Sequence, residues 1–213
     1  MFYLPETTVV NRVIPKNSFE KYATPSQRRQ FSEYVQKIIW LNKLSSETTN
    51  LAGNEIKEIQ VFLIELKQKQ KIDGLLSVID RAIPYPIIFT IKYDSTFYCS
   101  ASQKHPHPLN EDNAIIDWTF KTDWLDILDY SLSILLKKNL ETVFENFCSQ
   151  ISNPNKTIIG LNELADFDRK IKSLQKEKER LINAINSCKQ FNKKVELNLE
   201  LRKIEQKLTQ LLK

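Results

Sequence analysis

The hydrophobic residues of this chain follow one pattern in its first 150 residues and a different one near its C-terminus. In the first part, short alternating or continuously apolar runs typical of strands are mixed with runs at helical spacing. In the last part, apolar residues recur every three or four positions, which is the heptad pattern of a coiled-coil seam. Pro154 and Gly160 between the two parts are typical of a linker. The sequence therefore predicts an α/β globular domain at residues 1–150, a linker at 151–162 and a basic coiled-coil hairpin at 163–213.

Four strands are expected in the first domain. The strongest candidate is Ile56–Lys67, whose continuously apolar centre at Val61–Ile64 is typical of a strand buried on both faces. Ile87–Tyr93 and Thr96–Ser102 flank a two-residue turn, which indicates a hairpin. Ile115–Lys121 is expected to form the fourth strand.

Helices are expected between these strands. Thr24 has the sequence context of an N-cap, and the helix that it begins is expected to continue through Leu41 at helical spacing. Asp73 is expected to cap a short helix, and Asp129–Ser149 to form a longer one, while Met1–Tyr22 is interpreted as an extended arm. This order of elements predicts an α+β fold, in which a mixed sheet of about four strands is covered by helices.

The C-terminal part carries the charge excess of the whole chain. Residues 163–213 contain 13 basic and 8 acidic residues, an excess of five that equals the formal net charge of +5 of the full sequence. Two heptad seams joined by one polar loop predict an antiparallel hairpin of helices. The residues expected to form its interaction surface are Leu174, Leu181, Leu201, Ile204 and Leu208.

The expected tip of this hairpin is basic. Lys189, Lys193 and Lys194 surround Phe191, and lysines held away from a globular body are suited to contact the phosphate backbone of DNA. The alternative interpretation is a solvated turn in which Phe191 is tucked between the two helices. The sequence leaves both interpretations open.

Several function classes are disfavoured by composition. The 3 glycines are far apart, so no glycine-rich nucleotide-binding loop is present. No secretory signal is evident, and no apolar run approaches the roughly 20 residues that cross a bilayer. Cys99, Cys148 and Cys188 show neither a disulfide framework nor zinc-site spacing, which favours a reducing, cytoplasmic location. No cofactor and no membrane partner are expected.

The predicted long strand contains the best candidate for a catalytic site. Glu65 and Lys67 have the E-x-K spacing of restriction-type nucleases, in which an acidic residue holds Mg²⁺ and a lysine positions water and phosphate. Glu58 is the upstream acidic residue, but it is seven positions from Glu65, so in a regular strand the two side chains face opposite sides. A solvated strand end is the preferred interpretation, and Mg²⁺ is implied only if the nuclease interpretation holds.

Two other groups of residues are interpreted as structural. His105 and His107 lack a third ligand at zinc-site spacing, so an exposed polar loop at His105–Asn113 is expected. Trp118, Phe120 and Trp124 have the residue types that stack nucleic-acid bases. Such a cluster more often closes a core where a strand meets a helix, and core packing is the interpretation taken here.

Five segments resemble a family of uncharacterised bacterial proteins that share a domain of unknown function. They are N-R-V-I-P-K (Asn11–Lys16), K-L-S-S-E-T-T-N-L (Lys43–Leu51), E-I-Q-V-F-L-I-E-L-K (Glu58–Lys67), A-I-P-Y-P-I-I-F (Ala82–Phe89) and K-Q-F-N-K-K-V-E-L-N (Lys189–Asn198). Members of this family are often encoded near Swi/Snf-type helicases and DNA methyltransferases of defence islands. The resemblance implies an association with such proteins and no particular activity.

The function expected from these observations is that of an accessory or adaptor subunit in a bacterial DNA-processing or phage-defence assembly of the restriction-modification kind. It would dock through its hairpin onto a protein partner such as a helicase or a DNA methyltransferase, with weak contact to DNA. Two alternatives stay open. One is a metal-dependent nuclease that uses Glu58, Glu65 and Lys67, and the other is a homo-oligomeric structural protein without nucleic acid. Whether the protein is an enzyme is left open, and a protein without enzymatic activity is the preferred interpretation.

Overall fold

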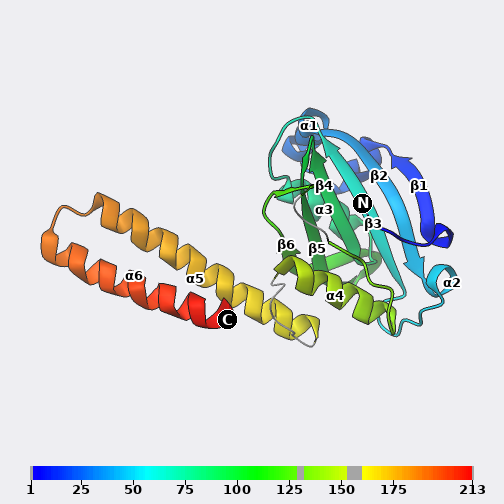
Figure 1. Ribbon diagram of the computed structural model, residues 1–213. Helices are drawn as coiled ribbons and strands as arrows, with labels where there is room; N and C mark the ends of the chain where they lie inside the picture. The colour runs from blue at the N-terminus through cyan, green and yellow to red at the C-terminus, as the bar shows by residue number, and fades with distance from the viewer. Residues whose placement is uncertain (1, 129–131, 153–159, 213) are drawn as a thin grey trace. The chain divides into compact units, whose positions relative to one another are not determined.

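The structure, a computed structural model, describes residues 2–128, 132–152 and 160–212. They form two compact units, Met1–Ser152 and Asn153–Lys213. The first unit combines a mixed β-sheet with helices on its two faces, which confirms the expected α+β class (Figure 1). The second unit contains two long helices. Residues 153–159, in the middle of the expected linker, lie outside the described residues.

The sheet of the described residues has seven strands, more than the four expected. The pairing order is β1-β2-β3-β4-β5-β6, and β7 pairs with β5. Only the β3–β4 pairing among these is parallel. The strands are β1 (Val9–Ile14), β2 (Val35–Ser45), β3 (Glu58–Leu66), β4 (Ile87–Tyr93), β5 (Thr96–His107), β6 (Asn110–Lys121) and β7 (Leu125–Asp126).

Two of the additional strands replace elements that the sequence interpretation assigned differently. β1 lies where an extended arm was expected, and its Val9 and Val13 are exposed. The pairing of β1 with β2 shifts register between Val9 and Arg12, and Asn11 has a φ of 47° in this bulge. β1 therefore forms a short, irregular edge of the sheet, without the alternation that makes a strand recognisable.

β2 occupies residues that were expected to continue the first helix, and that prediction is wrong. The register between β2 and β3 shifts between Val35 and Lys37 and again between Trp40 and Asn42. Each bulge moves the following residues to the opposite face of the strand. As a result, the apolar residues Val35, Ile38 and Ile39 have the three- and four-residue spacing of a helix while they form a strand.

The helices of the first unit begin and end at residues that differ in part from the expected ones. α1 (Pro25–Tyr34) begins at a capping box, in which the Gln27 N–H donates to Thr24 Oγ1 and the Thr24 N–H donates to Gln27 Oε1. The N-cap of α3 (Asp73–Ala82) is Ile72, so the prediction that Asp73 caps this helix is wrong. Short turns of helix occur at η1 (Glu6–Thr8), η2 (Lys16–Tyr22) and α2 (Ser46–Thr49).

α4 (Leu140–Ser152) is shorter than the helix expected at residues 129–149. Leu132 and Leu135, which were placed on that helix, lie in non-helical chain before it. Lys138 has a left-handed φ of 59°, and the Asn139 side chain accepts a hydrogen bond from the Thr142 N–H at 2.9 Å. An asparagine at this position is a strong helix start signal. Residues 129–131 of the expected helix lie outside the described residues.

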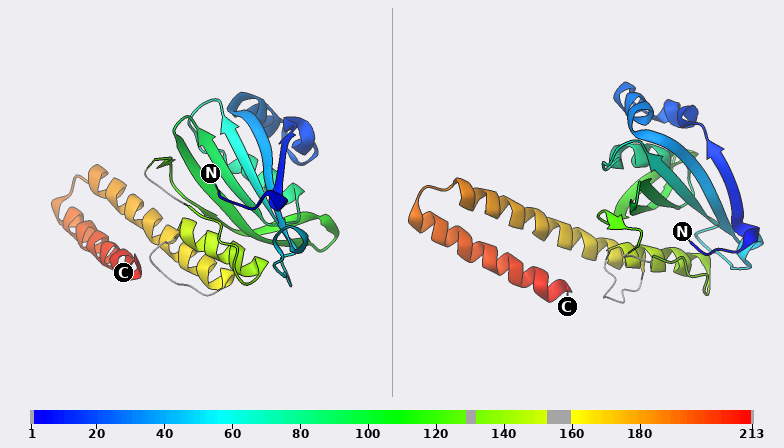
Figure 2. Two further views of the ribbon diagram at one scale, coloured as in Figure 1. Left: turned by 45° about the vertical axis from the view of Figure 1, so that its right-hand side comes forward. Right: turned by 45° about the horizontal axis from the view of Figure 1, so that its top comes forward.

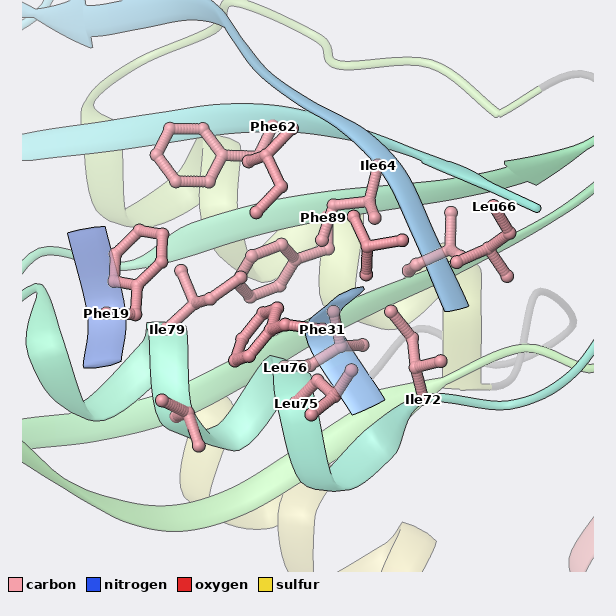
Figure 3. Packing of buried hydrophobic residues seen from close by; sticks show 14 of the residues in the cluster. Phe19, Phe31, Phe62, Ile64, Leu66, Ile72, Leu75, Leu76, Ile79 and Phe89 are labelled. Carbon is pink, nitrogen blue, oxygen red and sulfur yellow. The ribbon is translucent and has the colours of Figure 1, made fainter. Parts of the chain in front are cut away.

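The main core lies between one face of the sheet and the layer formed by η2, α1 and α3. Aromatic and aliphatic side chains from all of these elements meet there, as Figure 3 shows for Phe19, Phe31, Phe62, Ile79 and Phe89. α3 and α4 cover opposite faces of the sheet (Figure 1). The buried centre of β3 has apolar side chains on both faces, as its sequence indicated.

A buried ion pair holds α3 to the sheet. The ammonium of Lys104 on β5 donates to Asp80 Oδ1, to the Asp80 carbonyl and to the Ile83 carbonyl, each at 2.8 Å. The two side chains are 0% and 3% exposed. Burial lowers the pKa of Lys104, and the attraction of Asp80 opposes that shift. The lysine therefore uses all three N–H donors on the last turn of α3, where the carbonyls of a helix lack intrahelical partners.

A second polar anchor holds the segment before β3 to the start of α4. Glu141 Oε1 accepts hydrogen bonds from the backbone N–H groups of Asn54, Glu55 and Ile56 at 2.6, 2.9 and 3.1 Å. The chain is tight here, because a Cβ on Gly53 would lie 1.9 Å from the Ile56 carbonyl oxygen. Glycine is therefore required at this position.

The second unit consists of α5 (Leu161–Ser187) and α6 (Phe191–Leu212), which lie side by side and are joined at residues 188–190 (Figure 2). Ile171, Leu181, Ile204 and Leu208 form a buried cluster between them. Lys178 and Glu205 form an ion pair across the helices at 2.9 Å. Among the described residues, no helix combines the length and the apolar character that crossing a bilayer requires.

Replacing Lys104 with alanine is expected to lower the free energy of unfolding by about 3–5 kcal/mol, because Asp80 would stay buried without a cationic partner. Urea unfolding followed by circular dichroism measures this change. The matched control is Lys43→Ala, which removes the partly exposed Lys43–Glu58 pair and is expected to cost about 1 kcal/mol or less. Equal losses in the two variants would contradict the role assigned to Lys104.

Glu141→Gln is expected to reduce stability at neutral pH and to have no effect in acid. Burial alone would raise the pKa of Glu141, but the backbone N–H donors lower it below its ordinary value of 4.5. The stabilisation is therefore complete above pH 4.5 and disappears as pH falls through the lowered pKa. We expect a loss on the order of 1 kcal/mol at pH 7, because solvent screens this partly exposed group.

Glu145→Gln is the matched control in the same pH series. Burial, and then the charge of Glu141, raise the pKa of Glu145, so its charge opposes folding at neutral pH. Neutralising it is expected to leave stability unchanged or slightly higher. A loss in Glu141→Gln that persists below the lowered pKa would show that the carboxylate charge is not the cause.

Candidate functional site

The two acidic residues of the candidate nuclease site, Glu58 and Glu65, lie on opposite faces of β3. Glu58 bonds to Lys43 at 2.7 Å, and its other oxygen accepts from Gln60 Nε2 at 3.0 Å. β3 pairs with β4 without a break from Gln60 to Glu65, so the seven-residue spacing leaves Glu58 and Glu65 on opposite faces. The structure does not bring these two carboxylates together.

Glu65 and Lys67 lie at the end of β3. In the sheet register, Glu65 is opposite Lys37 of β2 and Lys92 of β4. The exposed Lys67 donates through Nζ to the Ser32 carbonyl oxygen at 2.7 Å, which directs it toward α1. Glu65 therefore has lysines on both neighbouring strands, an arrangement suited to balancing its charge.

Both histidines lie on strand β5, not in the long polar loop that was expected, so that prediction is wrong. β5 and β6 both continue into the segment that was expected to be a loop, so only a tight turn after His107 joins them. His105 Nδ1 is 2.9 Å from Asp117 Oδ2 on β6. The pairing of His105 with Asp117 across two strands could not be predicted from the sequence, because no periodic spacing links the two residues.

The aromatic cluster is divided between the core and its border. Phe120 is fully buried, and Trp124 packs edge-on against Tyr98 at 4.9 Å between ring centroids. The Lys69 ammonium lies 5.3 Å from the Trp124 ring centroid. These contacts are those of the core interpretation.

The groupings of metal-ligand side chains and the burial of two of the cysteines bear on metal and thiol chemistry. Within the described ranges, no three His, Cys, Asp or Glu side chains gather in a way that suits a metal ion. Cys99 and Cys148 are buried. Burial raises the pKa of Cys99 to about 12, so its reactive thiolate form is suppressed at neutral pH.

The residues predicted to form the interaction surface of the second unit lie between its own two helices. Leu181, Ile204 and Leu208 are buried in the cluster between α5 and α6, and Leu174 and Leu201 pack against it. Because they contact each other within the chain, they hold the helix pair together.

α6 has a second apolar surface that the sequence interpretation missed. Phe191, Val195 and Leu199, here called the outer stripe, follow each other at four-residue intervals and are 80%, 44% and 53% exposed. At about 100° per residue, they lie on the side of α6 opposite the residues that contact α5. The four-residue spacing of these apolar residues could have indicated the outer stripe from the sequence. The heptad pattern of the seam occupies the same stretch of sequence and obscured it.

The tip between the helices is basic and open. Phe191 is exposed there, which excludes the interpretation that it is tucked between the helices. Lys189 and Lys193 line a recess of about 370 Å³, together with Cys188 and Leu197. The recess borders the seam residue Leu197 and no residue of the outer stripe, so Lys193 and the outer stripe lie on different sides of α6.

Comparisons with known proteins give a family but no relative of established activity. The profile of a family described as Domain of unknown function (DUF4391) matches residues 2–208. No curated protein and no solved structure matches the chain. The family match spans both units, so the helix pair is part of the family's domain.

Purified protein is expected not to cut duplex or single-stranded DNA in the presence of Mg²⁺ or Mn²⁺, because Glu58 and Glu65 face opposite sides of β3. Gel electrophoresis of plasmid and oligonucleotide substrates measures this. Metal-dependent cleavage that disappears in both Glu65→Ala and Lys67→Ala would establish the nuclease alternative and overturn this expectation.

Proposed function

We propose that this chain, which belongs to the DUF4391 family, is a non-enzymatic adaptor subunit that docks onto a partner protein through its second unit. In this proposal α5 and α6 form a coiled-coil hairpin, and the outer stripe is the docking surface. The partner belongs to a bacterial DNA-processing or phage-defence assembly, for which a helicase or a DNA methyltransferase is the expected class.

The single observation that carries this proposal is the exposure of the outer stripe. Phe191, Val195 and Leu199 are apolar, contiguous along α6 and largely exposed. Burying such side chains stabilises a complex by about 1.5–3 kcal/mol for each fully buried residue. Anchors at four-residue intervals are characteristic of helix-to-helix recognition. The seam residues already hold α5 and α6 together, so a partner helix can pack on the outer side without separating them.

The positive charge of the second unit defines the chemistry of the partner. Lys189, Lys193 and Lys194 are close to Phe191 in the sequence, and the unit from Glu163 onward carries the entire positive excess of the chain. A partner helix with an apolar face bordered by Asp or Glu complements this surface. DNA is the less favoured occupant, because three lysines give few phosphate contacts and leave the apolar stripe unused.

Replacing Phe191 and Leu199 with serine is expected to reduce capture of the partner at least about tenfold, because the two largest anchors of the outer stripe are lost. The measurement is quantitative affinity capture from the native host with the full-length chain as bait. Leu109→Ser is the matched control, since Leu109 is 90% exposed but lies on the turn between β5 and β6.

Three results would overturn the proposal. One is unchanged capture by the Phe191→Ser, Leu199→Ser variant while Leu109→Ser behaves like wild type. Another is a concentration-dependent homodimer, measured by light scattering, that the variant abolishes, because then a second copy occupies the stripe. The third is binding to duplex DNA with a slope of log affinity against log salt of about −2 to −3, lost when Lys189, Lys193 and Lys194 become alanine.

A further inference from the structure

The side of α5 that faces away from α6 carries a row of exposed cationic and small polar side chains. The members of this basic row are Arg169, Ser173, Lys176, Arg180, Asn183 and Ser187. At about 100° per residue they lie within about 80° of one another around the helix. The seam residues that pack against α6, such as Leu181, are on the other side of α5. Arg169 begins the row and forms an ion pair with Asp166.

The acidic residues of this part of α5 are separated from the basic row. Only Glu177 and Glu179 are acidic between the first and last members of the row, and the rotation per residue puts one on each side of it. Within the described part of the chain, Lys176 and Arg180 have no ion-pair partner. A helix face that is only solvated typically places opposite charges three or four residues apart, where they pair. The centre of the basic row lacks such pairing.

The basic row continues into the recess at the tip of the helix pair. Ser187, the last member of the row, lines this recess of about 370 Å³ together with Lys189 and Lys193. The row alone is about 27 Å long, at a rise of about 1.5 Å per residue. Row and recess are here called the basic surface. Its cations are Arg169, Lys176, Arg180, Lys189 and Lys193.

The residue types of the basic surface suit the phosphate backbone of a base-paired nucleic acid. Arginine, lysine, serine and asparagine all donate hydrogen bonds to phosphate oxygens in complexes with DNA. None of the six residues of the row is apolar, so the row cannot insert into a lipid bilayer as an amphipathic helix does. None is aromatic, so the row offers no ring on which an unpaired base could stack.

We propose that the basic surface binds the phosphate backbone of double-stranded DNA, without preference for sequence. The major groove of B-DNA is about 12 Å wide, so a straight helix can lie along it and reach the phosphates at its rims. The major groove of an RNA duplex is too narrow for this. The proposal does not depend on docking through the outer stripe, because that stripe lies on the side of α6 that faces away from α5. DNA and a partner protein can therefore be bound together.

The number of cations sets the salt dependence of this binding. Each phosphate contact contributes roughly −0.9 to the slope of log affinity against log salt, so five cations predict a slope of about −4 to −5. The three tip lysines alone would give about −2 to −3. Affinity at physiological salt is expected in the non-specific range, with a dissociation constant of about 10⁻⁴–10⁻⁶ M.

The test is a fluorescence-anisotropy titration of a short random-sequence DNA duplex with the full-length chain over a series of salt concentrations. The variant Lys176→Gln, Arg180→Gln removes two cations from the centre of the basic row and keeps good helix formers there. Its affinity at low salt is expected to fall at least about tenfold, and its slope to become about −2 to −3. Asn183→Glu is a second variant, which places an acidic residue in the row and is expected to weaken binding as well.

Arg202→Gln, Lys203→Gln is the matched control. It removes the same two residue types from exposed positions of α6 on the side of the outer stripe, and DNA affinity is expected to stay unchanged. Circular dichroism checks that each variant is folded. Partner capture by Lys176→Gln, Arg180→Gln is expected to equal that of wild type, so the docking proposal is tested separately.

Four results would overturn the assignment of the basic surface to DNA. They are absence of DNA binding at low salt, equal loss of affinity in the control variant, wild-type affinity in a folded Lys176→Gln, Arg180→Gln variant, and tighter binding to an RNA duplex of the same sequence.

Discussion

The buried pair of Lys104 and Asp80 is the interaction on which the arrangement of the first unit depends. Placing a lysine and an aspartate away from water costs several kcal/mol for each ion, and only complete satisfaction of their hydrogen bonds compensates for it. Lys104 meets that requirement by donating to Asp80 and to two carbonyls at the end of α3. The position of α3 is thereby restricted to the one that brings all three acceptors to the ammonium.

This restriction extends along the chain to a pocket beside β1. Ile83, whose carbonyl binds Lys104, is part of the pocket lining, as is Tyr85. The next residue, Pro86, accepts the Gln60 N–H at 2.9 Å and begins the parallel pairing of β4 with β3. The end of α3, the pocket wall and the parallel strand pair are therefore positioned by one continuous segment. A shift of α3 would change all of them together.

The sequence predicted those elements in which local chemistry and burial agree. β3 was recognised because its apolar run is long and buried on both faces, and α1 began where Thr24 and Gln27 form their capping box. β2 was misread because two bulges give a strand the apolar spacing of a helix. The buried polar atoms and the candidate sites were less accessible to prediction. Gln60 Oε1 lacks a hydrogen-bond donor only because of its three-dimensional surroundings, and the outer stripe of α6 was obscured by the heptad seam on the same helix.

The bulge in β1 has a consequence for how the protein behaves at high concentration. A straight edge strand with exposed valines is a template on which another chain can add its own strand, and this is a common origin of aggregation. The left-handed residue Asn11 interrupts the hydrogen-bonding row of β1 at its centre, so no long run of free N–H and C=O groups faces outward. Behind it, β2 has 11 residues and would be a far better template. The irregular first strand thus acts as a cover that protects β2 and keeps the sheet from growing past β1.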